Sequence, residues 1–131
     1  MIKFIKRHLN TILWAVIILI LCGAPSSEFP SVGFLNIPHL DKVVHFGLYF
    51  VFTLLLVSEN NTLRLSGGIT NKSMLIGFIL AVAYGGIIEL MQKFVFTSRG
   101  ADFVDFLANF VGSITAILCY KFLNKLSRRL I

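Results

Sequence analysis

Residues 85–110 read GGIIELMQKFVFTSRGADFVDFLANF, and this stretch decides how the second half of the chain folds. Its two ends are almost wholly apolar, whereas its middle carries Glu89, Gln92, Arg99, Asp102 and Asp105. The apolar ends continue into longer apolar runs on both sides, so the stretch predicts two helices joined by a short turn at about residues 94–101. The polar groups must therefore gather where the two helices meet.

The rest of the chain is as apolar as the ends of this stretch. It has 131 residues, 56% of them hydrophobic and 14% charged, with a mean hydropathy of +0.85. A soluble domain of this length cannot bury so much apolar surface, which favours a lipid bilayer as the solvent. Apolar segments at about residues 9–24, 43–57, 74–94 and 103–122 are each long enough for a short membrane span. The sequence therefore predicts an all-α, four-helix polytopic membrane bundle, with residues 1–131 forming a single domain.

The first segment also has features of a cleaved signal peptide, because basic residues precede its apolar run. Pro25 follows directly after Cys22-Gly23-Ala24 and is a poor residue next to a cleavage point, so an uncleaved helix is favoured. Cys22 and Cys119 each lie inside an apolar run, which predicts neither a disulfide nor a metal pair.

Basic residues give the expected orientation. One side of the membrane collects nine of them, namely Lys3, Lys6, Arg7, Arg64, Lys72, Lys121, Lys125, Arg128 and Arg129, and the other side only Lys42, Lys93 and Arg99. The positive-inside rule then predicts both termini in the cytoplasm and the polar part of residues 85–110 on the extracytoplasmic side. The net charge of +6 lies in short clusters beside apolar runs. This pattern is typical of topology signals and contacts with anionic lipids, and it predicts no nucleic-acid partner.

Helical spacing places polar or small residues on one face of three segments. In the second segment Asp41, His45 and Tyr49 share a face. In the third, a stripe of small residues leads to Glu89 and Gln92; the stripe consists of Gly77, Ala81 and Gly85. Small residues allow close approach of a neighbouring helix in a membrane.

The fourth segment has the same kind of face, made of Asp102, Asp105, Asn109 and Gly112. Ionised groups facing hydrocarbon cost several kcal/mol, so the three faces are expected to turn toward one another. We therefore predict one polar cluster at the extracytoplasmic end, made of His45, Glu89, Gln92, Arg99, Asp102, Asp105 and Asn109.

Each polar residue has a structural interpretation beside a functional one. Asp41 and Asp102 are placed to cap helices, and Glu89 is placed to form an ion pair with Lys93 or Arg99. Alternatively, Asp41 orients His45 four residues on as a general base, with Glu89 as a second acid–base group. Arg99 and Lys42 suit an anionic ligand. No recognised metal-ligand spacing is present, and we expect no metal and no cofactor.

These residues also resemble the signatures of a known family. Asp41-Lys42-x2-His45-Phe46-x2-Tyr49 resembles the first signature of the VanZ-like membrane proteins. The family's second signature is resembled by Glu89-x2-Gln92, followed by Arg99 and then by Asp102-x2-Asp105-x3-Asn109-x2-Gly112. The loop Phe29-Pro30-Ser31-Val32 is similar too, and the resemblance covers about residues 25–116. It implies a multi-pass protein of the bacterial cytoplasmic (inner) membrane. The family is named for an accessory protein of glycopeptide resistance associated with teicoplanin.

Three hypotheses follow for the function. The first is binding: the extracytoplasmic cluster forms a pocket for an anionic lipid headgroup, a cell-wall precursor or a glycopeptide-related ligand. Its binding residues are predicted to be Lys42, Tyr49, Gln92, Arg99, Asp102, Asp105 and Asn109. The second is an enzyme at the membrane interface that acts on a lipid-linked envelope substrate through His45 and Glu89. The third is an ion-pair clamp that fixes helix order. Membrane lipids are the expected partners, and oligomerisation is left open.

Overall fold

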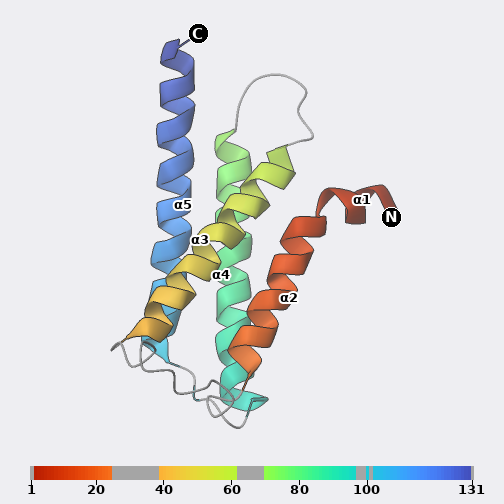
Figure 1. Cartoon of the computed structure of the whole chain (residues 1–131), viewed down its shortest axis with the longest axis vertical. Helices are drawn as coiled ribbons and strands as arrows, with labels where there is room; N and C mark the ends of the chain where they lie inside the picture. Colours follow the sequence, from red (N-terminus) through yellow and green to blue (C-terminus); the bar gives the residue numbers. More distant parts are fainter. Residues whose placement is uncertain (1, 25–38, 62–69, 97–99, 101, 131) are drawn as a thin grey trace.

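The computed structural model describes residues 2–24, 39–61, 70–96, 100 and 102–130, and within these ranges all regular secondary structure is α-helical. The helices are α1 (Ile2–Arg7), α2 (Leu9–Gly23), α3 (Leu40–Asn61), α4 (Asn71–Phe94) and α5 (Phe103–Leu130), as labelled in Figure 1. The predicted all-α class is confirmed, and the four main helices correspond to the four apolar segments.

Three helices are long and apolar enough to cross a membrane, namely Leu40–Asn60, Asn71–Phe94 and Phe103–Leu123. The fourth apolar helix, α2, has 15 residues. Many large apolar side chains on these helices face outward, including Ile79, Leu90 and Val111. Exposed apolar surface of this extent is what lipid contact requires, and it fits a four-helix membrane bundle.

Several helix ends differ from the sequence prediction. Helix α3 begins at Leu40 instead of about residue 43, because the charged Asp41 and Lys42 are satisfied inside the helix end. Helix α4 begins at Asn71, where the Thr70 side chain accepts a hydrogen bond from the Ser73 amide at 3.2 Å and caps the helix. Helix α5 continues to Leu130, well past the apolar run. An apolar run marks the part of a helix that spans the membrane, and the helix itself can continue past that run into water.

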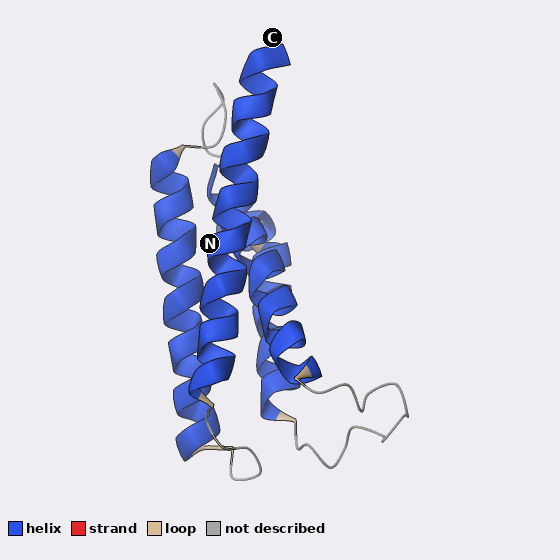
Figure 2. Ribbon diagram, turned by 90° about the vertical axis from the view of Figure 1, so that its left-hand side faces the viewer, coloured by secondary structure: helices blue, strands red, loops and turns tan. Residues whose placement is uncertain are grey.

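Helix α3 is central and packs against α2, α4 and α5, most extensively against α5. Figures 1 and 2 show α5 projecting past the other helices at its C-terminal end. Close approach to α3 depends on glycines in both partners. A Cβ at Gly112 of α5 would overlap the Phe46 backbone carbonyl, and one at Gly77 of α4 would lie 2.6 Å from Val57 Cγ2. The predicted small-residue stripe of α4 thus faces α3.

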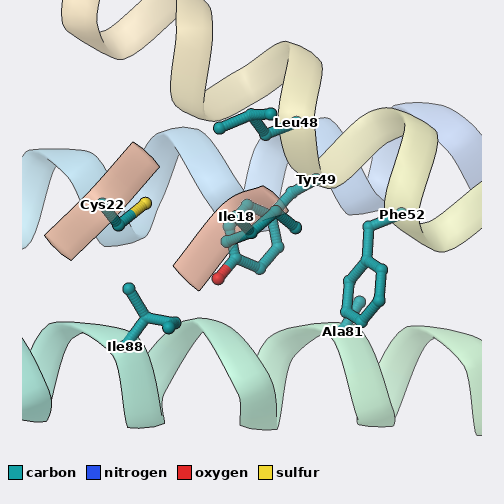
Figure 3. Close-up of a cluster of buried hydrophobic side chains, with 7 residues drawn as sticks. All are labelled: Ile18, Cys22, Leu48, Tyr49, Phe52, Ala81 and Ile88. Atoms are coloured by element: carbon teal, nitrogen blue, oxygen red, sulfur yellow. The ribbon is translucent and has the colours of Figure 1, made fainter. Parts of the chain in front are cut away.

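The apolar core lies among α2, α3 and α4, and Figure 3 shows its buried side chains. Its members are Ile18, Cys22, Leu48, Tyr49, Phe52, Ala81 and Ile88. Aromatic side chains also donate hydrogen bonds to backbone carbonyls of neighbouring helices. Trp14 Nε1 donates to Leu48 O at 2.9 Å, Tyr84 OH to Ala15 O at 2.7 Å, and Tyr120 OH to Leu54 O at 2.7 Å. These bonds join α2 to α3, α4 to α2, and α5 to α3.

Four helix ends meet at one end of the bundle, the lower end in Figure 1. They are the C-terminal ends of α2 and α4 and the N-terminal ends of α3 and α5. Glu89 lies near the end of α4, and Asp102 and Asp105 lie at the start of α5, so the fold brings these residues close to Lys42 and His45 of α3.

Candidate functional site

Lys42 is the centre of a charged cluster at this end, which we call the Lys42 cluster and which contains Asp41, Lys42, Asp102 and Asp105. The Lys42 ammonium lies 2.8 Å from Asp41 Oδ2, 2.8 Å from Asp102 Oδ2 and 2.5 Å from Asp105 Oδ1. An ammonium has three N–H donors, and each has a carboxylate partner here. Lys42 therefore joins the start of α3 to the start of α5, and its side chain is only 19% exposed.

Asp102 combines two structural roles. Its Oδ1 accepts a hydrogen bond from the Val104 amide at 2.9 Å, which caps α5, as one interpretation of the sequence proposed. Its Oδ2 accepts from Lys42. The Lys42 ammonium, followed by the Val104 amide, holds the pKa of the Asp102 carboxyl below its ordinary value. Asp102 is therefore a carboxylate at neutral pH.

His45 lies one turn deeper in α3 and contacts α5 twice. Its Nδ1 is 3.0 Å from Asn109 Oδ1, and its Nε2 is 3.8 Å from Asp105 Oδ2. With the amide oxygen as acceptor, Nδ1 carries the proton, which leaves Nε2 facing the carboxylate. The sequence assigned the orienting role to Asp41, and this role stays a prediction. Asp41 turns toward Lys42, and the partners of His45 come from α5.

Glu89 approaches the cluster from α4. Its Oε2 accepts a hydrogen bond from the Asp102 amide at 3.3 Å, and the residue is only 8% exposed. The anticipated ion pair with Lys93 does not form, because the Lys93 ammonium lies over the Phe94 ring at 5.4 Å from its centroid. Glu89 thus links the end of α4 to the start of α5 through the backbone.

Several buried polar atoms next to the cluster have no hydrogen-bond partner among the described residues. They are Glu89 Oε1, Asn109 Nδ2 and the Tyr49 hydroxyl. Asn109 is 1% exposed and Tyr49 0%. Buried polar groups are paired in nearly all folded proteins, so these three atoms are candidates for hydrogen bonds to a polar ligand or to water.

The other predicted binding residues do not all lie at the cluster. Gln92 turns away from the cluster, because its Nε2 donates to Cys22 O at 2.9 Å and thereby joins α4 to α2. Tyr49 lies in the apolar core, with its ring 3.2 Å from where a Cβ on Gly85 would stand. Arg99 lies outside the described residues, so its predicted role stays a prediction. Among the described residues, no three His, Cys, Asp or Glu side chains are grouped so that they could hold a metal ion.

A groove lies beside the cluster, between α4 and α5. Its volume is about 700 Å³, and Glu89 and Asp102 form part of its wall. Lys93 also lines it, and the remaining lining is apolar, including Leu90, Phe103 and Phe106. The acidic residues of the site are therefore continuous with an apolar surface on the flank of the bundle.

A second buried carboxylate lies at the opposite end, and the sequence analysis missed it. Glu59 Oε2 accepts a hydrogen bond from the Thr11 amide at 3.4 Å and lies 3.7 Å from His8 Nδ1. Thr11 is in the first turn of α2, so Glu59 of α3 stabilises the N-terminus of a neighbouring helix. Glu59 is followed by Asn60 and Asn61, which are typical of loops, and no local signal marks such a contact between distant residues.

Comparison with curated proteins found no match, and comparison with solved structures found none either. The sequence profile of one family, described as VanZ/LLP1, matches residues 2–124. This match covers nearly the whole chain, including both motifs on which the resemblance was based and all the residues of the Lys42 cluster. A helical bundle with three helices of membrane-spanning length agrees with that match. The chain therefore belongs to the VanZ/LLP1 family.

Proposed function

We propose that this VanZ-like membrane protein binds the polar headgroup of a lipid or lipid-linked cell-wall precursor at the end of the bundle that holds the Lys42 cluster. The observation that carries the proposal is the unused hydrogen-bonding capacity of Glu89 Oε1 and Asn109 Nδ2, which are buried beside charged groups. Such atoms lower the stability of the fold unless a ligand or water forms hydrogen bonds with them, because an unpaired buried polar group keeps its desolvation penalty.

The basic residues support a placement of this end outside the cytoplasm, in the bacterial inner membrane, with both termini inside. That side would give the site access to headgroups and precursors of the outer leaflet. A glycopeptide-related ligand such as teicoplanin is part of the same proposal, because the family is named for an accessory protein of that resistance.

Lys42 is a poor candidate for direct contact with an anion. Its three N–H donors are already shared among three carboxylates, and an incoming phosphate would have to displace one of them. The role of Lys42 is better explained as a clamp between α3 and α5, which keeps His45 and Asn109 in contact. An anion-binding role at this end would fall to Lys93, which lines the adjacent groove, or to Arg99, which lies outside the described residues.

A matched pair of substitutions tests the proposal. Glu89 and Glu59 are both 8% exposed, but they lie at opposite ends of the bundle. Glu89→Gln is expected to weaken the binding of lipids and precursors, whereas Glu59→Gln is expected to leave it unchanged. Binding is measured by native mass spectrometry of the purified protein, and teicoplanin susceptibility of cells is a second readout. Equal binding by both variants and the unsubstituted protein would contradict the proposal.

The geometry of His45 favours one alternative, an enzyme acting on a lipid-linked envelope substrate. An imidazole whose Nδ1 is fixed by Asn109 and whose Nε2 faces Asp105 has the arrangement of a general acid–base group. Lipid extracts from cells with no protein, the natural protein, His45→Ala and Glu89→Gln would reveal a product. If no lipid species differs among the four extracts, the enzyme hypothesis fails.

A further inference from the structure

The groove between α4 and α5 has the chemical character of a binding site for a whole lipid. Leu90, Phe103 and Phe106 supply an apolar wall, and the Phe103 and Phe106 rings are stacked with centroids 6.3 Å apart. Gly86 lies in the same wall, and a Cβ there would approach only Phe106, at 3.9 Å. The missing side chain at Gly86 therefore widens the groove and leaves its apolar surface uncovered.

The polar lining of the groove selects the charge of an occupant. Glu89 and Asp102 lie in the wall together with Lys93, which is one helical turn beyond Glu89. The adjoining Lys42 cluster contains three carboxylates and one ammonium, so the described charged groups of this neighbourhood are net negative. Asp102 already accepts bonds from Lys42 and the Val104 amide. Glu89 Oε1 is the carboxylate oxygen here that has no partner among the described residues.

We infer that the groove binds an aminophospholipid, whose primary ammonium donates to Glu89 and whose phosphate contacts Lys93. One acyl chain would lie along Phe103, Phe106 and Leu90. This inference rests on the proposed function and names its ligand class. A primary ammonium offers three N–H donors, which suits an unpaired carboxylate oxygen, whereas a quaternary ammonium offers none. A zwitterionic headgroup also matches acidic and basic groups one turn apart better than a purely anionic headgroup does.

The test is a lipid titration of the purified protein in detergent micelles. Phosphatidylethanolamine, phosphatidylcholine and phosphatidylglycerol with identical acyl chains are added separately, and bound lipid is counted by native mass spectrometry. Phosphatidylethanolamine is expected to bind at least tenfold more tightly than the other two, because a charge-assisted hydrogen bond is lost with each of them. Glu89→Gln is expected to remove most of that preference.

A second pair of variants tests the position of the acyl chain. Gly86→Leu fills the groove and is expected to weaken binding of phosphatidylethanolamine at least tenfold. Gly47→Leu is its control, because no atom lies within 4 Å of a Cβ at Gly47 and that helix face is outside the groove. Equal binding by the two leucine variants overturns the inference. Circular dichroism and a single size-exclusion peak establish that both variants are folded.

The remaining outcomes separate this inference from the proposed function. Binding of phosphatidylglycerol or a lipid-linked precursor that depends on Glu89, without a preference for phosphatidylethanolamine, overturns the inference and leaves the proposed function intact. The absence of any lipid binding that depends on Glu89 overturns both. If the natural protein is a dimer that Gly86→Leu converts to a monomer, the groove is an interface between copies of this chain and the inference is overturned.

Discussion

The contact between Gly112 and α3 allows a quantitative prediction for Gly112→Ala. A Cβ at this position would lie 3.1 Å from the carbonyl carbon and 3.2 Å from the Cα of Phe46, and closer still to the carbonyl oxygen. Backbone atoms cannot rotate away, so α3 and α5 would have to separate by roughly 1 Å to restore ordinary van der Waals distances. Overpacking of this kind costs about 1–3 kcal/mol.

Alanine also has a compensating effect, because it stabilises a helix interior by about 0.5–1 kcal/mol relative to glycine. The expected net loss in free energy of unfolding is therefore about 0–2.5 kcal/mol. Gly86→Ala is the control, since its Cβ would meet only Phe106 at 3.9 Å. We expect that variant to gain about 0.5–1 kcal/mol from helix propensity alone.

Separation of α3 and α5 would also act on the candidate site. The His45 Nδ1 and Asn109 Oδ1 atoms are 3.0 Å apart, and they come from the same two helices. His45 directly precedes Phe46, and Asn109 lies about one turn before Gly112. An increase of roughly 1 Å exceeds the range of a hydrogen bond. The histidine ¹⁵N resonances of Gly112→Ala should therefore shift, whereas those of Gly86→Ala should not.

The assay is reversible unfolding in mixed micelles of a mild detergent and dodecyl sulfate, followed by the fluorescence of Trp14, the single tryptophan. Circular dichroism follows total helix content in parallel. If Gly112→Ala is as stable as Gly86→Ala, and its histidine resonances are unchanged, then α3 and α5 do not depend on a glycine for their close approach. The description of the site as held by that approach would then be wrong.

Four further predictions concern charges and backbone strain. Lys42→Met should lower the free energy of unfolding by about 1–2 kcal/mol at neutral pH and low salt, because three carboxylates lose their shared cation. Unfolding measured at several ionic strengths checks this prediction, and an equal loss of stability at high salt would argue against it. Lys42 depresses the pKa of Asp102, so the stability that Asp102 contributes is present above its unfolded pKa and is lost as the pH falls below about 4. Acid titration of Lys42→Met should therefore show a smaller loss of free energy of unfolding than acid titration of the natural protein. Glu59→Gln should destabilise α2 by about 0.5–1 kcal/mol and shift Trp14 emission to the red, and unchanged emission and melting would show that the carboxylate charge is not needed there. His39 has a φ of 63°, so His39→Gly should be neutral or stabilising in thermal unfolding while His39→Val is destabilising; the opposite order would refute strain at this residue.

Sequence patterns predicted the helices and the end at which polar groups gather, because both depend on local composition. The apolar run of α4 and the start of α5 at Phe103 were correctly placed. The convergence of Glu89, Asp102, Asp105 and Asn109 near His45 followed from the cost of facing lipid, and the structure places these residues together.

The individual contacts could not be predicted in the same way. Helical spacing turns Lys42 about 100° away from Asp41, yet its long side chain reaches across to two residues of α5. Gln92 shares a helical face with Glu89 but pairs with the Cys22 carbonyl of α2. Helical spacing fixes the direction of a Cβ, whereas the partner depends on where neighbouring helices cross, which one sequence does not contain.

The aromatic hydrogen bonds between helices have a consequence for how this sequence tolerates change. Trp14, Tyr84 and Tyr120 each donate to a main-chain oxygen, which every amino acid possesses. Replacing Ala15, Leu48 or Leu54 by another apolar residue leaves the acceptor in place, whereas replacing a donor by phenylalanine deletes the bond. Each of these helix pairs therefore tolerates substitution unequally. The residue that supplies the acceptor oxygen can be replaced, whereas the aromatic donor cannot be replaced without loss of the hydrogen bond.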